Sequence, residues 1–238
     1  MRIPLNSLGA SAIAVAALSA LVLLVAGPGY RLGVWALPTG FMLLRWGAYG
    51  GLLAAALAAG ALWRARGRSA PAVLALAIAL TTVAIPLRLQ RAAAAAPPIH
   101  DISTDTADPP TFEAVVPLRA DAPNTLEYSQ EAARHQRSGY PDIRPLILEM
   151  PAPQVFDRAL QAARDEGWEI VDANADEGRI EATDTTTFFG FKDDVVVRLT
   201  TLGGRTIVDV RSVSRVGRGD AGTNARRVRE YLERLSQS

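Results

Sequence analysis

The side chains best suited to binding an anion are gathered near the end of the chain. A glycine-rich turn at residues 217–222 follows a predicted strand and opens a predicted helix. Backbone N–H groups at a helix start attract negative charge, and guanidinium groups add charge-assisted hydrogen bonds. The candidate ligand-binding residues around the turn are Arg211, Arg215, Arg218, Asp220 and Asn224. We therefore predict a site for an anionic ligand or lipid headgroup; the alternative is that these arginines pair with carboxylates of the same domain.

The same turn, Gly217-Arg-Gly-Asp-Ala-Gly222, matches the G-x-G-x-x-G pattern of dinucleotide-binding proteins. That pattern binds a pyrophosphate within a parallel βαβ unit, with an acidic residue about 20 positions further on. Here the preceding strand belongs to a predicted antiparallel hairpin, and the remaining residues are too few to supply the rest of the unit. We expect no dinucleotide site and no cofactor.

A second polar segment starts at His100 and supplies Asp101 and Asp105, with Asp108 and several hydroxyl groups close by. Oxygen ligands suit Ca²⁺ or Mg²⁺, but this spacing is not that of an EF-hand. Asp, Ser and Thr side chains in such loops more often bond the loop's own backbone. We expect no metal site, and we keep His100, Asp101 and Asp105 as further candidate ligand-binding residues.

The other chemically active residues form no recognisable catalytic pattern. The chain has no cysteine, which excludes thiol catalysis, disulfides and thiolate metal sites. The two histidines, His100 and His135, lie in no triad, zincin or nucleophile-elbow pattern. Asp193 and Asp194 would point to opposite faces of a strand and would not share one site. We therefore name no catalytic residue, and the alternative function is an enzyme of unfamiliar, hydrolase-like type that uses the loop of His100 and Asp101.

A two-residue turn, Gly203-Gly204, positions the arginine-bearing strand. Residues 193–202 and 205–215 flank this turn, which predicts an antiparallel hairpin. The predicted opposing pairs are Leu199 with Val208, Val197 with Val210, and Arg198 with Asp209. The first two pairs make one face of the hairpin apolar, and the third is a favourable charge pair on its polar face.

The other elements of this part of the chain surround the hairpin. We expect an exposed helix around residues 126–137 in an otherwise irregular stretch. The remaining predicted elements are a strand at 145–149, a helix at 153–166, strands at 168–173 and 179–186, and a helix at 221–235. The order β-α-β-β-β-β-α predicts an α+β domain with an antiparallel sheet and helices covering one face. The three phenylalanines within 185–191 fit core packing; the alternative is a grip on a lipid or peptide.

The first part of the chain is a predicted membrane anchor. A helix crosses the hydrocarbon core in about 20 apolar residues. The three stretches of this kind are residues 7–30, 46–63 and 69–87. We predict three spans within residues 1–91, a junction at 92–98 and a soluble domain at 99–238. The first stretch is too long for a signal peptide, and Gly27-Pro28-Gly29 is a poor cleavage site. Gly47 and Gly51 either let helices approach closely or are ordinary small residues.

Charge divides the chain at the same place. Residues 1–96 hold eight arginines and no acidic residue, which leaves 17 basic and 24 acidic residues, a net charge of −7, for residues 97–238. An acidic domain is a poor partner for nucleic acid. Arg64, Arg66 and Arg68 cluster between the second and third spans, and such loops stay in the cytoplasm. We therefore predict a multi-pass protein of a bacterial inner membrane with its soluble domain outside the cytoplasm, in the periplasm.

Five strings of the soluble domain are shared with a known family. They are HDISTDTADPPTF (100–112), YPDI (140–143), GW (167–168), IEATDTTTFFGFKDDVVVR (180–198) and DVRSVSRVGRGDAGTNARR (209–227). They resemble a bacterial family catalogued as a domain of unknown function, number fourteen-ninety-nine, over nearly all of residues 98–238. The resemblance implies an extracytoplasmic domain, since similar proteins carry it behind lipoprotein signals or membrane spans. It implies no activity.

These features together predict a non-catalytic binding or scaffolding module of the bacterial cell envelope. Its expected partners are the lipid bilayer and an anionic ligand or envelope protein. The motivation is a polar sheet face and an arginine-rich helix start without a catalytic pattern.

Overall fold

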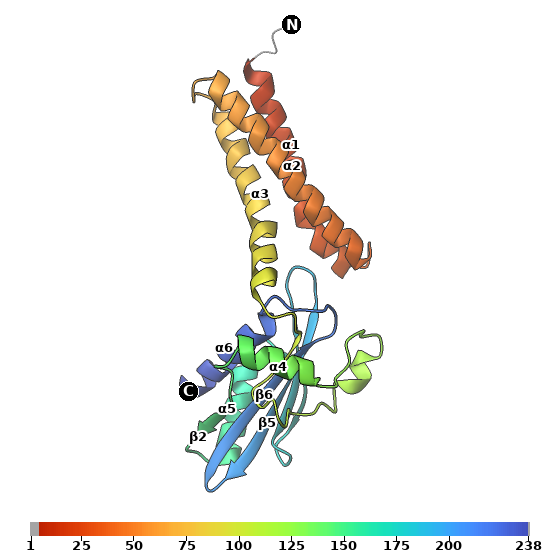
Figure 1. Ribbon diagram of the computed structural model, residues 1–238, viewed down its shortest axis with the longest axis vertical. Helices are drawn as coiled ribbons and strands as arrows, with labels where there is room; N and C mark the ends of the chain where they lie inside the picture. Colours follow the sequence, from red (N-terminus) through yellow and green to blue (C-terminus); the bar gives the residue numbers. More distant parts are fainter. Residues whose placement is uncertain (1–4, 238) are drawn as a thin grey trace. The chain divides into compact units, whose positions relative to one another are not determined.

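The computed structural model describes residues 5–237, and the chain divides into two compact units (Figure 1). The first unit contains the N-terminal residues as far as Arg91, together with Thr187–Gly190. The second unit contains Ala92–Thr186 and the chain from Phe191 onward. Each unit has its own core and is described separately below.

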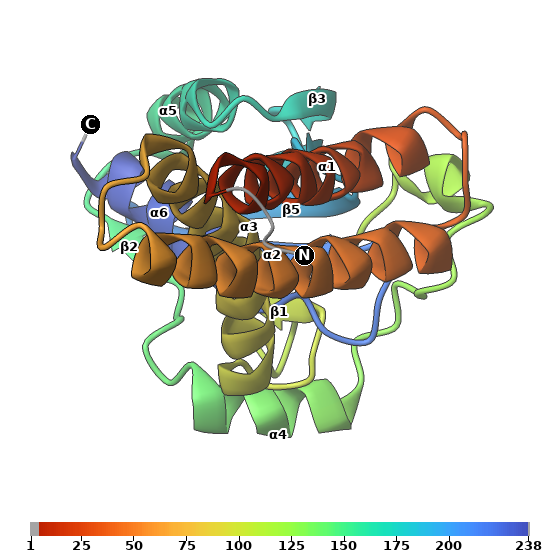
Figure 2. The same cartoon turned by 90° about the horizontal axis from the view of Figure 1, so that it is seen from above.

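Three long helices make up most of the first unit. They are α1 (Leu5–Arg31), α2 (Leu37–Arg64) and α3 (Ala70–Ala95). Each is long and apolar enough to cross a membrane, as the sequence predicted. α2 and α3 extend beyond the predicted apolar stretches and include Arg45, Arg88 and Arg91, whose long side chains can carry a charged group to water from within a helix. α1 and α2 run side by side, and α3 diverges from them toward its C-terminal end (Figure 1, Figure 2).

Small residues allow the three helices to pack closely. The buried alanines at their centre are Ala12, Ala16, Ala54, Ala58, Ala75 and Ala79. A Cβ added at Gly47 would lie 3.1 Å from the Cβ of Leu23, and one added at Gly51 would lie 2.9 Å from Cγ2 of Val83. Gly47 therefore faces α1 and Gly51 faces α3, which decides between the two interpretations of this pair in favour of close helix approach.

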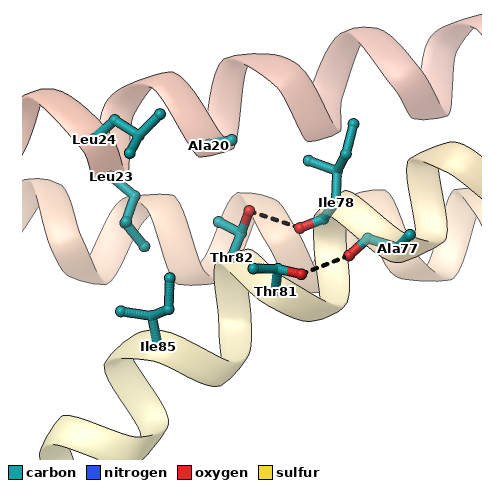
Figure 3. Close-up of a pocket in the computed structure, with 8 residues that line it drawn as sticks. All are labelled: Ala20, Leu23, Leu24, Ala77, Ile78, Thr81, Thr82 and Ile85. Carbon is teal, nitrogen blue, oxygen red and sulfur yellow. Dashed lines mark hydrogen bonds between the residues drawn. The ribbon is translucent and has the colours of Figure 1, made fainter.

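An apolar groove of about 350 Å³ lies between α1 and α3 (Figure 3). It is lined by Ala20, Leu23, Leu24, Ala77, Ile78, Thr81, Thr82 and Ile85. The two threonine hydroxyls donate to backbone carbonyls of their own helix, Thr81 Oγ1 to Ala77 at 3.0 Å and Thr82 Oγ1 to Ile78 at 2.8 Å. Since these hydroxyls are satisfied within α3, the lining suits hydrocarbon.

The second unit is built on an antiparallel sheet of six strands among the described residues. The strands are β1 (Asp101–Ser103), β2 (Leu146–Leu148), β3 (Glu169–Asn174), β4 (Arg179–Thr185), β5 (Lys192–Leu202) and β6 (Arg205–Ser214). Their spatial order is β1-β6-β5-β4-β3, and β2 also pairs with β6. The helices are η1 (Val116–Arg119), α4 (Gln130–Gly139), α5 (Ala152–Asp165) and α6 (Thr223–Gln237). From β2 onward the order is the predicted β-α-β-β-β-β-α, so the α+β prediction is confirmed.

The hairpin of β5 and β6 has the predicted register. Leu199 lies opposite Val208, and Val197 opposite Val210. Both turn glycines have positive φ, 56° at Gly203 and 84° at Gly204, as a tight two-residue hairpin turn requires. The predicted cross-strand charge pair is also present, with Nη2 of Arg198 3.1 Å from Oδ2 of Asp209.

Helices α5 and α6 cover one face of the sheet (Figure 2). The valines of β5 and β6 that point to this face are buried against Val155, Phe156 and Val228. The rings of Trp168 and Tyr231 stack with centroids 4.8 Å apart, and the Tyr231 hydroxyl donates to the Ala159 carbonyl at 2.9 Å. This face holds the main apolar core of the unit.

Three elements differ from the sequence prediction, and the first is η1, which lies in a stretch that was expected to be irregular. Residues 101–103 were expected in a polar loop but form β1, because Asp101 and Ser103 pair with Val213 and Arg211 of β6 and Ile102 is fully buried. Helix α4 starts at Gln130 instead of residue 126, because the Ser129 side chain accepts a hydrogen bond from Ala132 N and caps the helix.

Candidate functional site

Strand alternation gathers charged side chains on the sheet face opposite α5 and α6. The residues on this face are Arg179, Glu181, Asp194, Arg198, Asp209, Arg211 and Arg215. Residues 104–128, here called the covering segment, pass over this face, and most of these side chains are buried beneath it. The apolar cluster under the covering segment is small, with Phe112, Val115, Val196 and Val213 as its buried members. Polar contacts therefore carry much of the attachment.

The carboxylate of Glu181 binds the backbone of the covering segment. It accepts N–H donation from Glu113 at 2.8 Å, Ala114 at 3.1 Å and Val115 at 2.9 Å. The Glu181 side chain is fully buried, and three successive N–H groups replace the water that it loses. These N–H groups precede η1 and could bind an anion, but the Glu181 carboxylate already accepts hydrogen bonds from all three.

Asp194 joins the sheet to the covering segment through two guanidinium groups. Arg119 of η1 donates to its Oδ2, Arg215 Nη2 lies 2.7 Å from its Oδ1, and Thr183 donates to it at 2.7 Å. Burial alone would raise the pKa of Asp194, but the hydrogen bonds from Arg215, Thr183 and Arg119 hold it below its ordinary value. Arg215 thus has a structural role, and its Nη1 also donates to the Leu118 carbonyl at 2.8 Å.

Arg211 and Asp101 form a buried bidentate ion pair. Arg211 Nε lies 3.0 Å from Asp101 Oδ1, and Nη2 lies 2.7 Å from Oδ2. The guanidinium also donates to the Pro110 and Leu126 carbonyls and lies 5.3 Å from the ring centroids of Phe112 and Tyr128. Burial raises the pKa of Asp101, because one guanidinium does not offset the desolvation of this carboxyl.

Asp220 occupies the N-terminus of α6 with its own carboxylate. It accepts from Gly222 N at 2.8 Å and from Asn224 N at 2.7 Å. Burial raises the pKa of Asp220 despite these hydrogen bonds. The buried Asn224 side chain connects the helix start to β1 and β6, since it donates to the His100 carbonyl at 2.9 Å and accepts from Ser212 Oγ at 2.8 Å. The first turn of α6 is therefore organised by internal contacts.

The exposed charge at this end of the sheet belongs to Arg218. It lies in the β6–α6 turn, residues 216–222, between Gly217 and Gly219. The carbonyl of Arg218 lies 3.5 Å from Nδ1 of His100, and Asp220 N donates to the Ile99 carbonyl at 3.2 Å. The turn therefore lies against the residues through which the chain enters β1.

The third predicted carboxylate, Asp105, organises a local turn. Its Oδ1 accepts from Ala107 N at 2.8 Å and Asp108 N at 2.9 Å, and Ser103 Oγ donates to its backbone carbonyl at 2.7 Å. These are the backbone contacts expected of Asp and Ser side chains in loops. Among residues 5–237, no group of three or more His, Asp or Glu side chains is placed to hold a metal ion.

The predicted site residues are thus brought together, with different roles. Those from β1, β6 and the start of α6 meet at one end of the sheet, where Arg211 and Arg215 are paired with carboxylates and Arg218 faces solvent. Sequence reasoning missed Arg119 and Glu181 as partners. Charged residues at alternate positions of predicted strands were the available signal for Glu181, but Arg119 gave none.

A family model described as a protein of unknown function, DUF1499, matches residues 101–235, which is more than half of the chain. The chain belongs to the DUF1499 family. The match begins at the first residue of β1 and ends within α6, so the DUF1499 region contains the sheet, the covering segment and the ion pairs described above. A search of the curated proteins finds no match.

Proposed function

We propose that this DUF1499 protein is a non-catalytic binding or scaffolding module, held at the membrane by three helices, that takes an anionic ligand at the β6–α6 turn. The observation that carries the proposal is the exposed Arg218 guanidinium in a glycine-flanked turn beside His100. An exposed guanidinium binds phosphate through charge-assisted hydrogen bonds. The N–H groups of α6 are not part of the proposed site, because Asp220 accepts from them.

Of the arginines predicted to bind the ligand, two have structural roles. Arg211 and Arg215 are committed to Asp101 and Asp194, so their removal would disturb the fold before it tested ligand binding. Arg218 lacks such a role in strand pairing. It is therefore the residue on which a binding test should rest.

A phosphate-bearing lipid headgroup is the ligand class best supported by the chain's layout. A Cβ added at Gly219 would lie 3.6 Å from Cα of Pro98, which follows closely after the end of α3 at Ala95. The chain from Leu87 to His100 carries Arg88 and Arg91 and no acidic residue. Basic residues next to a span attract anionic lipids.

The test compares Arg218→Ala with a matched Arg226→Ala control. Arg226 is exposed on α6, where its Nε lies 3.9 Å from Glu230. The full chain is placed in nanodiscs of phosphatidylcholine with or without phosphatidylglycerol, and the lipids retained by each chain are counted by native mass spectrometry. We expect Arg218→Ala to lose retained phosphatidylglycerol and Arg226→Ala to keep it. Equal retention by Arg218→Ala and the unaltered chain would reject the lipid site. Inorganic phosphate added to phosphatidylcholine discs then tests for a free phosphate ligand.

The proposed location of the second unit is outside the cytoplasm of a bacterial cell, at the inner membrane. The support is the arginine cluster between α2 and α3, which favours a cytoplasmic position for that loop. C-terminal fusions to alkaline phosphatase and to a fluorescent protein that matures only in the cytoplasm test it. High phosphatase activity without fluorescence would support the proposal, and the reverse would refute it.

The hydrolase-like alternative has less support from the same geometry. It needs Asp101 or His100 to act on a substrate, yet both oxygens of Asp101 bind Arg211 and the His100 ring lies next to the Arg218 carbonyl. We therefore favour binding over catalysis at this end of the sheet.

A further inference from the structure

The segment Thr187–Gly190 groups with the membrane helices and not with the sheet whose strands it connects. Phe189 is only 7% exposed. Its ring centroid lies 5.3 Å from that of Phe41, 6.2 Å from Tyr30 and 5.2 Å from Phe188. These are distances at which aromatic rings attract one another. The first unit therefore contains an aromatic cluster that joins the end of α1, the start of α2 and this segment.

Two helix glycines make room for the phenylalanines. A Cβ added at Gly27 of α1 would lie 2.5 Å from the Phe188 carbonyl oxygen and 2.6 Å from Cδ1 of its ring. A Cβ added at Gly40 of α2 would lie 3.1 Å from Cε1 of Phe189. Glycine is a poor helix residue, so its use where a side chain would collide with the same aromatic pair points to a socket.

Polar contacts secure the edge of this socket. Arg31, the last residue of α1, donates from Nη1 to the Thr187 carbonyl at 3.2 Å. The Arg31 side chain also lies against Gly190, where an added Cβ would be 2.9 Å from Cγ of Arg31. Trp35 Nε1 donates to the Ala26 carbonyl at 3.0 Å and closes the turn between α1 and α2. Tyr and Trp side chains at helix ends are typical of the membrane interface.

We propose that Thr187–Gly190 is an intramolecular plug: Phe188 and Phe189 occupy a glycine-lined socket formed by Gly27 of α1 and Gly40 of α2 at the membrane interface. The occupant is a segment of this chain, so the phenylalanines are neither core residues of the sheet nor a grip for an external peptide. The inference is independent of the anion site.

The absence of cysteine makes the proposal directly testable by cross-linking the full chain in isolated membranes. An added Cβ at Gly190 lies 3.5 Å from the Cβ of Arg31, within the range for a disulfide. The double variant Arg31→Cys with Gly190→Cys should therefore form a disulfide under mild oxidation. The disulfide is detected because both thiols are then protected from a polyethylene-glycol maleimide. Arg31→Cys with Thr201→Cys is the control, since Thr201 lies at the opposite end of β5.

A second pair avoids strain at Gly190, whose φ is +70°. Arg31→Cys with Thr187→Cys, treated with a short bis-maleimide, should become bridged because the Arg31 side chain already spans to Thr187. Cross-linking of either cysteine pair supports the plug, provided that the control pair with Thr201→Cys is not cross-linked. If neither pair is cross-linked in folded protein, or the control pair is cross-linked as readily, the proposal is overturned.

The socket itself is tested by filling it. Gly27→Leu should abolish bridging of the Arg31–Thr187 pair by displacing Phe188, whereas Gly60→Leu should leave it unchanged. Gly60 is the matched control because an added Cβ there meets only Leu8, at 3.9 Å. Undiminished bridging with Gly27→Leu would show that Gly27 is not part of a socket.

Discussion

Asp193 and Asp194 are adjacent in β5, but their side chains form ion pairs on opposite faces of the sheet. Asp193 accepts from Arg227 Nη2 of α6 at 2.6 Å, on the helix-covered face. Asp194 accepts from Arg119 and Arg215 on the other face. Successive strand residues point to opposite faces, so one dipeptide attaches both a helix and the covering segment to the same strand.

Because Arg119 and Arg215 both donate to Asp194, we expect removal of this carboxylate to lower the stability of the second unit most. Asp194→Asn leaves the buried guanidinium of Arg119 and the partly buried guanidinium of Arg215 without their counter-charge, and we expect the free energy of unfolding of the second unit to fall by about 3–5 kcal/mol. Urea-dependent pulse proteolysis of the full chain in detergent measures this. Asp157→Asn, at an exposed position of α5, is the control and should change the value by less than about 0.5 kcal/mol. A comparable small change for Asp194→Asn would contradict a structural role.

Asp194 and Asp101 should respond to pH in opposite directions. The folded pKa of Asp194 is lowered, so its contribution to stability is present above the unfolded value near 3.8 and is lost as pH falls through the folded pKa. The folded pKa of Asp101 is raised, so its contribution is full below the unfolded value and is lost as pH rises through the folded pKa. The unfolding free energy of the unaltered chain minus that of the Asn variant should rise with pH for Asp194 and fall for Asp101. Slopes of the same sign would reject this assignment.

Glu181 should control opening of the covering segment. In Glu181→Gln an NH₂ group replaces one acceptor that faces backbone donors, so at least one N–H group of residues 113–115 loses its partner. We expect a loss of about 1–3 kcal/mol, with faster amide hydrogen exchange in residues 104–128. Exchange followed by mass spectrometry checks this, with the exposed Glu169→Gln of β3 as control. Unchanged protection of residues 104–128 would argue against the role of Glu181.

Of Gly47 and Gly51 in α2, Gly51 should be the less tolerant of a larger side chain. Gly51→Leu would drive a side chain into Val83 and the Ala79 carbonyl of α3 and separate the helices. We expect a lower Tm and a smaller monodisperse fraction in detergent, measured by size-exclusion chromatography after heating. Gly60 is on the same helix, where an added Cβ meets only Leu8, at 3.9 Å, so Gly60→Leu should behave like the unaltered chain.

Local patterns predicted most of the architecture. Three apolar stretches without acidic residues predicted the three long helices. The glycine pair at 203 and 204 set the register of β5 and β6 so closely that Arg198 and Asp209 pair as expected. Such features depend on a few neighbouring residues, and short-range sterics and hydropathy decide them. The short strand β1 escaped prediction because three residues carry no periodicity of their own.

The sequence by itself determined the division of the chain into apolar helices and an acidic α+β domain, and it placed the arginines of β6 on the polar face of a hairpin. Only the tertiary structure decided that Arg211 and Arg215 are bound by Asp101 and Asp194, while Arg218 faces solvent. The partners of β6 are about 20 to 110 residues away in the chain. Strand alternation tells which face a side chain occupies, but the carboxylate that meets it depends on how distant segments fold over that face.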